Sequence, residues 1–363
     1  MFVFSRFHLP GLARTLIKNT DSFPVRIWLV SNGSSMNHAD GHLVVQSKEP
    51  PFCVKNVDCT RWEEVSSTIR WHADFSSRME APMMIRLLND PLIGRQQLGV
   101  AATRDVSYEE DYQRTSELLK SRPNGTVTMI SHLREVVNSI KSVPRELLED
   151  RSIAIVYVTD SLPKNDDGME GDQAAAEFLN VLQELEGVPV WFVIRLSTDE
   201  QAVVNFYGNV DNMISSEERS GHMQTGLHLD VLDDYVSEAE EIQKHNPWLN
   251  YGYPLHLCRE SAVNFPVFDA LNDRPLLHDE LAKFICLLFD RHTQAFMEQP
   301  LPNPKTEYRA FREEVQQLLQ KNGGLWNPIK KRIMPWVDVR VMDRIYGEDG
   351  GNGAASSCTC NLL

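Results

Sequence analysis

The sequence predicts an α/β protein built on a doubly wound, Rossmann-like parallel sheet that helices cover on both faces. Short apolar runs that suit strands buried on both faces occur at residues 25–30, 83–88, 153–158 and 188–196. Segments with the apolar spacing of amphipathic helices alternate with these runs. Polar loops follow two of the runs, at the position where α/β sheets place their ligands.

The strand expected at residues 25–30 is the element around which the rest of the chain is organised. Pro24 marks its beginning, and its residues are apolar apart from Arg26, as a central strand of a parallel sheet requires. A polar elbow at residues 31–36 follows it directly. This elbow lies just past the carboxyl end of a strand, where we expect a ligand-binding edge.

The other elements of the sheet region follow in chain order, each with its own signal. The helix expected at 61–79 carries an apolar stripe that includes Trp62, Val65 and Ile69. Ser107 is an expected N-cap, and Glu110 three residues later completes a capping box. The expected strands are 25–30, 41–46, 83–88, 99–102, 153–158 and 188–196, and the expected helices are 61–79, 107–120, 128–143, 172–185 and 199–210.

A chain of 363 residues is too long for one small core, so two packed units are expected. Beyond about residue 215 the pattern becomes mainly helical, with a linker at 215–221, one strand at 227–232 and helices at 234–245, 254–261, 278–289 and 308–321. The expected organisation is an N-terminal packing segment at 1–20, the sheet domain at 21–215, a helical accessory domain at 216–325, and a tail at 326–363 that is first basic and then Gly-rich and flexible.

The elbow runs Ser31-Asn-Gly-Ser-Ser35-Met36. A strand followed by such an elbow resembles the opening of a von Willebrand factor A (vWA) domain, Asp-x-Ser-x-Ser-Met, and the resemblance extends over about residues 20–215. In that family the Asp and the two Ser side chains hold a divalent cation together with a later Thr and a later Asp. Aligned on Ser35 and Met36, this chain has Ser31 at the Asp position and Gly33 at the first Ser position.

Two later loops continue the resemblance. The loop at 124–128 places Val127, flanked by Thr126 and Thr128, at the family's Thr position. The loop at 158–163 places Asp160 at the position of the family's second Asp. The resemblance therefore implies a degenerate metal site formed by Ser31, Ser35 and Asp160, in which only one carboxylate is left.

The ligand preferences of Mg²⁺ determine how tightly this degenerate site can bind the ion. The ion needs hard oxygen ligands in octahedral geometry and usually at least one carboxylate. The altered ligand set predicts weak Mg²⁺ binding unless Asp40 or a partner's carboxylate contributes, and no other cofactor is expected. The alternative is that the elbow keeps its shape because the sheet needs it, and that Asp160 caps a turn.

The sequence contains no motif that predicts catalysis, since a Walker A loop, Gly-x-Gly-x-x-Gly and Gly-x-Ser-x-Gly are all absent. A net charge of −15 argues against a nucleic-acid partner. The vWA resemblance implies protein recognition, so we expect a non-enzymatic adaptor. Its unknown partner is expected to dock on a rim formed by Asn32, Gly33, Ser34, Thr126 and Thr128. Two alternatives are a metal-dependent adhesion-type module and an enzyme with an unrecognised site.

The last residues predict attachment to a membrane. Residues 321–346 include six basic and two acidic side chains, and residues 347–357 are rich in Gly, Ala and Ser. Cys360 is followed by Asn361, Leu362 and Leu363, which resembles a C-a-a-X prenylation box. Cys358 is a candidate for palmitoylation, which would supply a second anchor.

Composition indicates a soluble globular chain, with 42% hydrophobic and 24% charged residues. No apolar run approaches the about 18 residues of a membrane span, and the N-terminus lacks the pattern of an export signal. The six cysteines are scattered without zinc-site spacing. The expected location is therefore the cytoplasm, at a membrane surface that the tail contacts.

Overall fold

The protein is described by a computed structural model over residues 10–46, 54–92, 94–103, 105–148, 151–219, 227–263, 265, 267–289 and 301–347. The chain divides into two compact units. Unit 1 comprises Leu16–Glu238 and His256–Asn264, and unit 2 comprises Phe2–Thr15, Ala239–Leu255 and Phe265–Leu363. The expected boundary at residue 215 does not coincide with this division. The helices α1 (Pro10–Ser22), α7 (Tyr235–His245) and α8 (Tyr253–Glu260) each contribute residues to both units.

Unit 1 is built on one six-stranded sheet, which confirms the expected α/β class. The strand order is β5-β4-β1-β6-β7-β8. The edge strand β5 runs antiparallel to β4, and all other neighbouring strands are parallel. The four apolar runs expected to form strands are adjacent in this sheet as β4, β1, β6 and β7. The strand bounds are β1 Arg26–Val30, β4 Met83–Leu87, β5 Gln97–Val100, β6 Ile153–Thr159, β7 Val190–Leu196 and β8 Leu227–Leu232.

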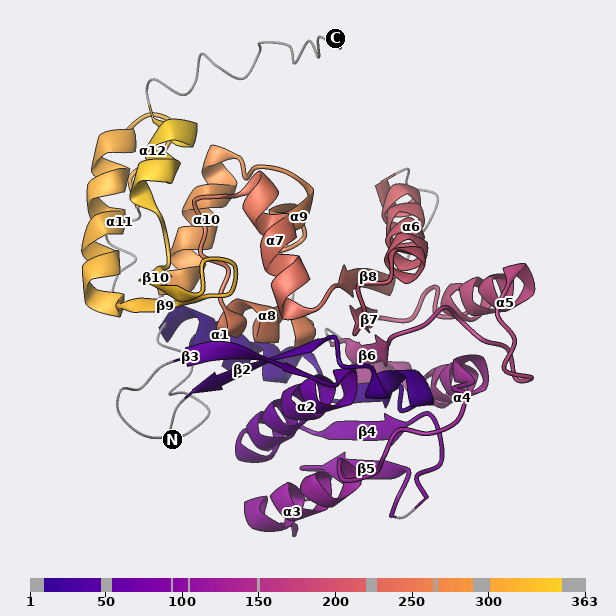
Figure 1. Cartoon of the computed structure of the whole chain (residues 1–363). Coiled ribbons are helices and arrows are strands. Elements are labelled where there is room, and N and C mark those ends of the chain that lie inside the picture. Colours follow the sequence, from indigo (N-terminus) through magenta and orange to yellow (C-terminus); the bar gives the residue numbers. More distant parts are fainter. Residues whose placement is uncertain are drawn as a thin grey trace, which may run out of the picture. The chain divides into compact units, whose positions relative to one another are not determined.

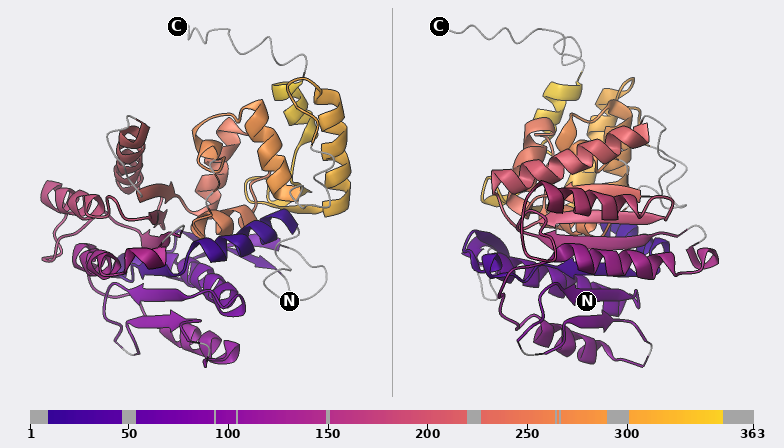
Figure 2. Two further views of the ribbon diagram at one scale, coloured as in Figure 1. Left: turned by 180° about the vertical axis from the view of Figure 1, so that it is seen from behind. Right: turned by 90° about the vertical axis from the view of Figure 1, so that its right-hand side faces the viewer.

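Two hydrophobic cores lie on opposite faces of the sheet because side chains alternate along each strand. In β1, Ile27 and Leu29 enter one core, and Trp28 and Val30 enter the other. The first core is covered by α4 (Met129–Lys141), α5 (Asp172–Gln183) and α6 (Gln201–Arg219), and the second by α2 (Arg61–Arg78) and α3 (Tyr108–Leu118). Figures 1 and 2 show these helices on either side of the strands.

Polar caps fix where the helices of the second face begin. Ser107 caps α3 as expected, because its hydroxyl accepts a hydrogen bond from the backbone of Glu110. A reciprocal capping box forms at α2 instead, between Thr60 and Glu63. This box makes Arg61 the first residue of α2, which places its side chain at the start of the helix.

The structure also contains elements that the sequence pattern did not predict. The strand β2 (Gly41–Gln46) pairs antiparallel with β3 (Val54–Cys59) in a separate ladder, and β3 was not expected. Residues 227–232 were assigned to a helical accessory domain but form the edge strand β8 of the main sheet. Short 3-10 turns occur at η2 (Ser34–Asn37) and η3 (Arg145–Leu148).

Unit 2 is mainly helical around an aromatic core in which Trp248 and Trp336 are fully buried and Phe284 packs on Trp248. Residues 326–346, expected to be the basic first part of the tail, are instead folded within unit 2. The reason is that Trp336 enters this core and Asp338 caps the helix Val339–Tyr346. The elements of unit 2 are α9 (Ala270–Asp273), α10 (His278–Phe289), α11 (Tyr308–Asn322), β9 (Gly324–Asn327), β10 (Arg332–Pro335) and α12 (Val339–Tyr346).

The predicted lipidation sites, Cys358 and Cys360, lie outside the described residues, as do the first nine residues of the predicted N-terminal packing segment at 1–20. The rest of that segment lies in α1. Among the helices described, none has the length and hydropathy needed to span a bilayer.

Candidate functional site

The candidate site lies at the carboxyl ends of β1 and β6, where the strand order reverses. The chain adds β4 and β5 on one side of β1, and β6, β7 and β8 on the other. Open α/β sheets bind ligands at such a switch point. Ser31 follows β1 and Asp160 follows β6, and the Ser31 hydroxyl donates to Oδ1 of Asp160 over 3.3 Å. The structure thus brings together two of the three predicted metal ligands, both of them buried.

A guanidinium group completes this pair of side chains. Arg61 approaches Oδ2 of Asp160 with its Nη1 at 3.3 Å. Its Nε and Nη2 donate to the two carboxylate oxygens of Asp40 over 2.7 and 2.6 Å. We call this arrangement of Asp40, Arg61 and Asp160 the Arg61 bridge. The hydrogen bond from Arg61 lowers the pKa of the Asp40 carboxyl below its ordinary value, so Asp40 is ionised at neutral pH.

The backbone holds Asp40 beside Arg61. The amide of Arg61 donates to the carbonyl of His38 over 3.0 Å. Gly41 packs against the helix start so closely that a Cβ there would lie 2.7 Å from the Thr60 carbonyl oxygen. Arg61 itself is in an unfavourable place for a cation, because the N-terminal end of a helix carries partial positive charge. The carboxylates of Asp40 and Asp160 therefore offset two costs: the repulsion between the guanidinium and this helix end, and the loss of water around the buried guanidinium.

The other predicted ligand positions are not arranged around Asp160. Within the described part of the chain, the Ser35 hydroxyl makes no hydrogen bond with Asp160. A Cβ at Gly33 would lie 3.0 Å from Cγ2 of Val127, so apolar packing fills the space where the vWA resemblance implies two hydroxyl ligands. Among the described residues, no group of three or more His, Cys, Asp or Glu side chains is placed to hold a metal.

A buried asparagine ties the loops of this edge together. The side chain of Asn32 donates to the carbonyl of Asn89 over 3.0 Å and accepts from its amide over 2.7 Å. The carbonyl of Asn32 accepts from the amide of Asn124 over 2.9 Å, and the amide of Ser34 donates to the carbonyl of Gly125 over 2.9 Å. These four hydrogen bonds join the loops that contain Asn32, Asn89 and Asn124 into one ordered surface.

The predicted rim residues differ in accessibility. Asn32 and Gly33 are buried, so they support the edge and do not offer side chains to a partner. Ser34 and Thr126 are exposed, and Thr128 is half-buried at the start of α4. Of the predicted rim residues, Ser34 and Thr126 are therefore the ones whose side chains are open to a partner. We call these two residues, together with the neighbouring loop described next, the accessible rim.

The loop at 164–172 extends this accessible rim. A Cβ at Gly168 would lie 3.3 Å from Cγ2 of Thr126, so the loop touches the predicted rim. The side chain of Asn165 accepts from the amides of Asp167 and Met169 over 3.1 and 2.9 Å, which orders the loop. Asp166 and Asp167 are exposed, and Met169 has 64% of its surface exposed. The rim thus combines negative charge with one large apolar side chain.

Sequence reasoning missed two residues of the site, Arg61 and Asn89. The signal for Arg61 is its position. It directly follows the capping Thr60, so its positive charge lies at the positive end of the helix dipole, which is unfavourable unless acidic partners are near. Asn89 directly follows the apolar run of β4 at residue 88, which places it at the same edge of the sheet as Ser31.

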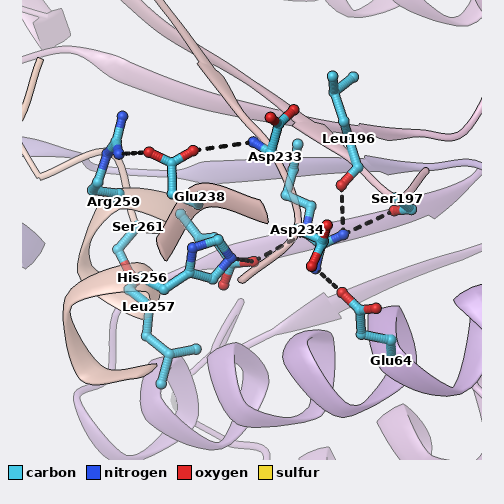
Figure 3. A network of polar contacts seen from close by, with 12 residues as sticks. Glu64, Leu196, Ser197, Asp233, Asp234, Glu238, His256, Leu257, Arg259 and Ser261 are labelled. Atoms are coloured by element: carbon cyan, nitrogen blue, oxygen red, sulfur yellow. Dashed lines mark hydrogen bonds and ion pairs between the residues drawn. The ribbon is translucent and has the colours of Figure 1, made fainter. Parts of the chain in front are cut away.

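A buried ion network lies elsewhere in unit 1 (Figure 3). Arg195 of β7 pairs with Glu64 of α2, and its Nε lies 3.3 Å from Oε1 of Glu260. Its Nη1 donates to the carbonyl of Leu196 over 2.6 Å and to the hydroxyl of Ser197 over 3.2 Å. Each of the three guanidinium nitrogens of Arg195 therefore donates at least one hydrogen bond inside the protein, which is what burial of an arginine requires.

Glu260 is the centre of a second set of contacts in the same network. Nε2 of His72 and Nε2 of His256 lie 3.2 and 3.4 Å from its carboxylate. Burial by itself would raise the pKa of Glu260, but His256, His72 and Arg195 hold it far below its ordinary value. Burial lowers the pKa of His72. Arg259 pairs with Glu238 beside this set, and the whole network is structural because it is closed to solvent.

Comparisons with known proteins give no family for this chain. No protein-family model matches it, and no curated protein matches it. Among solved structures, it is similar to a mutant of the PilB minor pilin from Streptococcus sanguinis, with a TM-score of 0.39, 11% identity, and coverage of 67% of this chain and 63% of that chain.

It is also similar to the pilus adhesin SpaC from Lactobacillus rhamnosus GG in its open conformation, with a TM-score of 0.36 and 12% identity. That match covers 67% of this chain and 30% of the adhesin. The chain thus spans less than two thirds of either protein. Likenesses of this size carry no conclusion about activity.

Proposed function

We propose that this chain is a non-enzymatic protein-interaction module of the vWA type, which recognises a basic partner surface without a bound metal ion. The observation that carries the proposal is the Arg61 bridge. A buried guanidinium stands beside Asp160 at the switch point, where the vWA resemblance implies a divalent cation. The strand order supports the doubly wound type, because the six strands numbered along the chain run 3-2-1-4-5-6 across the sheet.

The accessible rim is suited to a partner of opposite charge. Asp166 and Asp167 are exposed in the loop that contacts Thr126 through Gly168, and the Asp40 carboxylate of the Arg61 bridge is 46% exposed. Charge complementarity of this kind speeds association and selects partners, and an exposed apolar side chain such as Met169 supplies an anchor. The ordered loops beneath the rim reduce the entropy lost on binding.

The rim is tested by affinity capture from cell extract with quantitative mass spectrometry. Changing Asp166 and Asp167 to Lys should reduce capture of the proteins enriched on the parent chain by at least about tenfold, because the attractive charges become repulsive. The matched control changes Glu146 and Glu186 to Lys, two exposed acids that precede β6 and β7 at the opposite edge of the sheet.

Equal loss of capture in the rim variant and in the control variant would count against the rim as the docking surface. A second arm adds EDTA to the extract. Capture that is unchanged by EDTA supports recognition without metal, whereas capture abolished by EDTA favours the alternative of a metal-dependent adhesion-type module.

The proposal includes a tether to the cytoplasmic face of a membrane through the C-terminal sequence Cys360-Asn361-Leu362-Leu363. This tether rests on the resemblance to a prenylation box. Changing Cys360 to Ser should move the protein completely into the soluble fraction, because prenylation at this site is the primary anchor. Changing Cys358 to Ser should weaken attachment only in part, since it removes a second anchor and leaves the first.

Fractionation of cells and intact-mass analysis of the parent and both variants measure this directly. The parent should carry the added mass of an isoprenoid, and the Cys360→Ser form should lack it. A parent protein that is soluble and carries no added lipid mass would refute the tether but leave the rim proposal unaffected.

A further inference from the structure

Unit 2 carries a cluster of basic side chains on one surface. Lys330, Arg340 and Arg344 line a single groove of about 1380 Å³. Arg340 and Arg344 stand four residues apart in α12 and therefore share a face of that helix. Lys331 and Arg332 continue directly from Lys330, from the turn between β9 and β10 into β10 itself. We call these five residues the basic patch.

The positive charge of the basic patch is not neutralised by its neighbours. None of its five side chains forms an ion pair with any residue that the structure describes. Two acids close to the basic patch in sequence, Asp338 and Asp343, are engaged by other groups. Asp338 accepts from the amides of Arg340 and Val341 over 3.0 and 3.2 Å as the cap of α12.

The second acid, Asp343, is bound by two other side chains. Its carboxylate accepts two hydrogen bonds of 2.9 Å from Nε of Arg312 and one of 2.9 Å from the hydroxyl of Tyr308. A chain with a net charge of −15 therefore presents a local surface of the opposite sign. Such a surface attracts an anionic occupant.

Apolar side chains lie within the same surface. Ile333 is 57% exposed and lines the groove beside the basic residues, and Pro335 of the same strand is exposed. The turn that carries Lys330 and Lys331 has a fixed shape, because the amide of Lys330 donates to the Asn327 side chain over 2.6 Å. A rigid turn with cations around an exposed aliphatic side chain matches the interface of a bilayer, where the charges meet lipid phosphates and the aliphatic group enters the acyl boundary.

We propose that the basic patch binds the surface of an anionic membrane. The inference deepens the tether of the proposed function but does not need the lipid, since the patch belongs to the folded part of unit 2. A single prenyl chain gives only reversible membrane binding, and a polybasic surface is one of the second signals that make attachment stable. Cys360 follows Gly347 by thirteen positions, so an anchored tail keeps α12 and its two arginines near the bilayer.

The test is sedimentation of the full chain with vesicles, using protein whose intact mass shows no lipid. Vesicles of phosphatidylcholine with about 30% phosphatidylserine should bind the chain at least about tenfold more tightly than phosphatidylcholine alone. Binding should fall steeply as salt rises from about 0.1 M to about 0.5 M, because the Debye length shortens. Changing Lys330, Arg340 and Arg344 to Gln should weaken binding to the anionic vesicles at least about tenfold.

The matched control changes Lys283, Lys305 and Arg309 to Gln, three exposed cations of unit 2 that do not line the groove. It alters net charge by the same amount and should retain parental binding. The proposal is overturned if the chain binds both kinds of vesicle equally, or if the two triple variants behave alike. Binding of poly-glutamate that anionic vesicles do not displace would assign the groove to an acidic protein segment and would also overturn it. Because the lipid-free protein is used, failure here leaves the Cys360 tether standing.

Discussion

Replacing Arg195 with methionine is expected to lower the free energy of unfolding of unit 1 by about 3–5 kcal/mol. The substitution keeps an aliphatic side chain of similar length but removes the positive charge between Glu64 and Glu260. These two carboxylates are 8% and 0% exposed, so water cannot replace the lost partner. Removing one member of a buried ion pair leaves an uncompensated charge, which is far more damaging than the pair itself is stabilising.

Urea unfolding followed by far-UV circular dichroism measures this loss. The control is Arg274→Met, which breaks an ion pair with Glu280 in which the arginine is 46% exposed, and it should change stability by no more than about 1 kcal/mol. Adding Glu64→Gln to Arg195→Met should recover part of the loss, because one of the unpaired charges disappears. A loss of less than about 1 kcal/mol for Arg195→Met would show that the network contributes little.

Removing the side chain of Arg61 is expected to create affinity for Mg²⁺. The unmodified protein should bind Mg²⁺ no more tightly than about millimolar, because the Arg61 guanidinium occupies the surroundings of Asp160. In Arg61→Ala, the carboxylates of Asp40 and Asp160 and the hydroxyl of Ser31 lose their cation. The dissociation constant for Mg²⁺ should then fall at least about tenfold, since two freed carboxylates suit this ion.

Isothermal titration calorimetry with Mg²⁺ and Mn²⁺ measures the gain. Arg312→Ala in unit 2, which also frees a carboxylate, is the matched control and should gain no comparable affinity. Unchanged weak binding by a folded Arg61→Ala protein would contradict this account, as would micromolar binding by the parent chain. Thermal unfolding of each variant, alone and with Mg²⁺, shows whether the fold persists and whether the ion stabilises it.

Restoring a Mg²⁺ site at this edge of the sheet requires more substitutions than the sequence alone indicates. Changing Ser31 to Asp and Gly33 to Ser adds a carboxylate and a hydroxyl, which on sequence grounds predicts a recovered Mg²⁺ site. However, a Cβ at Gly33 would meet Cγ2 of Val127 at 3.0 Å, and Arg61 would remain in place. We therefore expect full recovery to need Val127→Thr and Arg61→Ala in addition.

The sequence predicted the central strands well because their signal is local. A run such as residues 153–158 is apolar on both faces, and this pattern alone identifies a buried parallel strand. The strand β8 was predicted as a strand but placed in the accessory domain. Its burial alternates, and its pairing with β7 depends on contacts distant in sequence. Trp336 likewise resembled a tail residue until its burial in an aromatic core was known.

The candidate site was predictable only in part. Ser31 and Asp160 could be paired because both follow strands that meet at one edge of the sheet. Arg61 could not be placed there from periodicity, since it contacts Asp160 across 99 positions and its direction is set by the start of α2. The long-range side-chain geometry, and not the identity of the strands, was the missing information.

The distance in sequence between Arg195 and Glu260 has a consequence for synthesis on the ribosome. All six strands of the sheet have been made by residue 232, yet Glu260, one of the two carboxylates that pair with Arg195, lies 65 positions after it, in the segment His256–Asn264 that returns to unit 1. A nascent chain that has exposed every strand therefore still holds this arginine with only one of its two carboxylate partners. Until that segment leaves the exit tunnel, unit 1 has all its strands but lacks the second counter-ion of Arg195, whose charge is compensated by Glu64 alone.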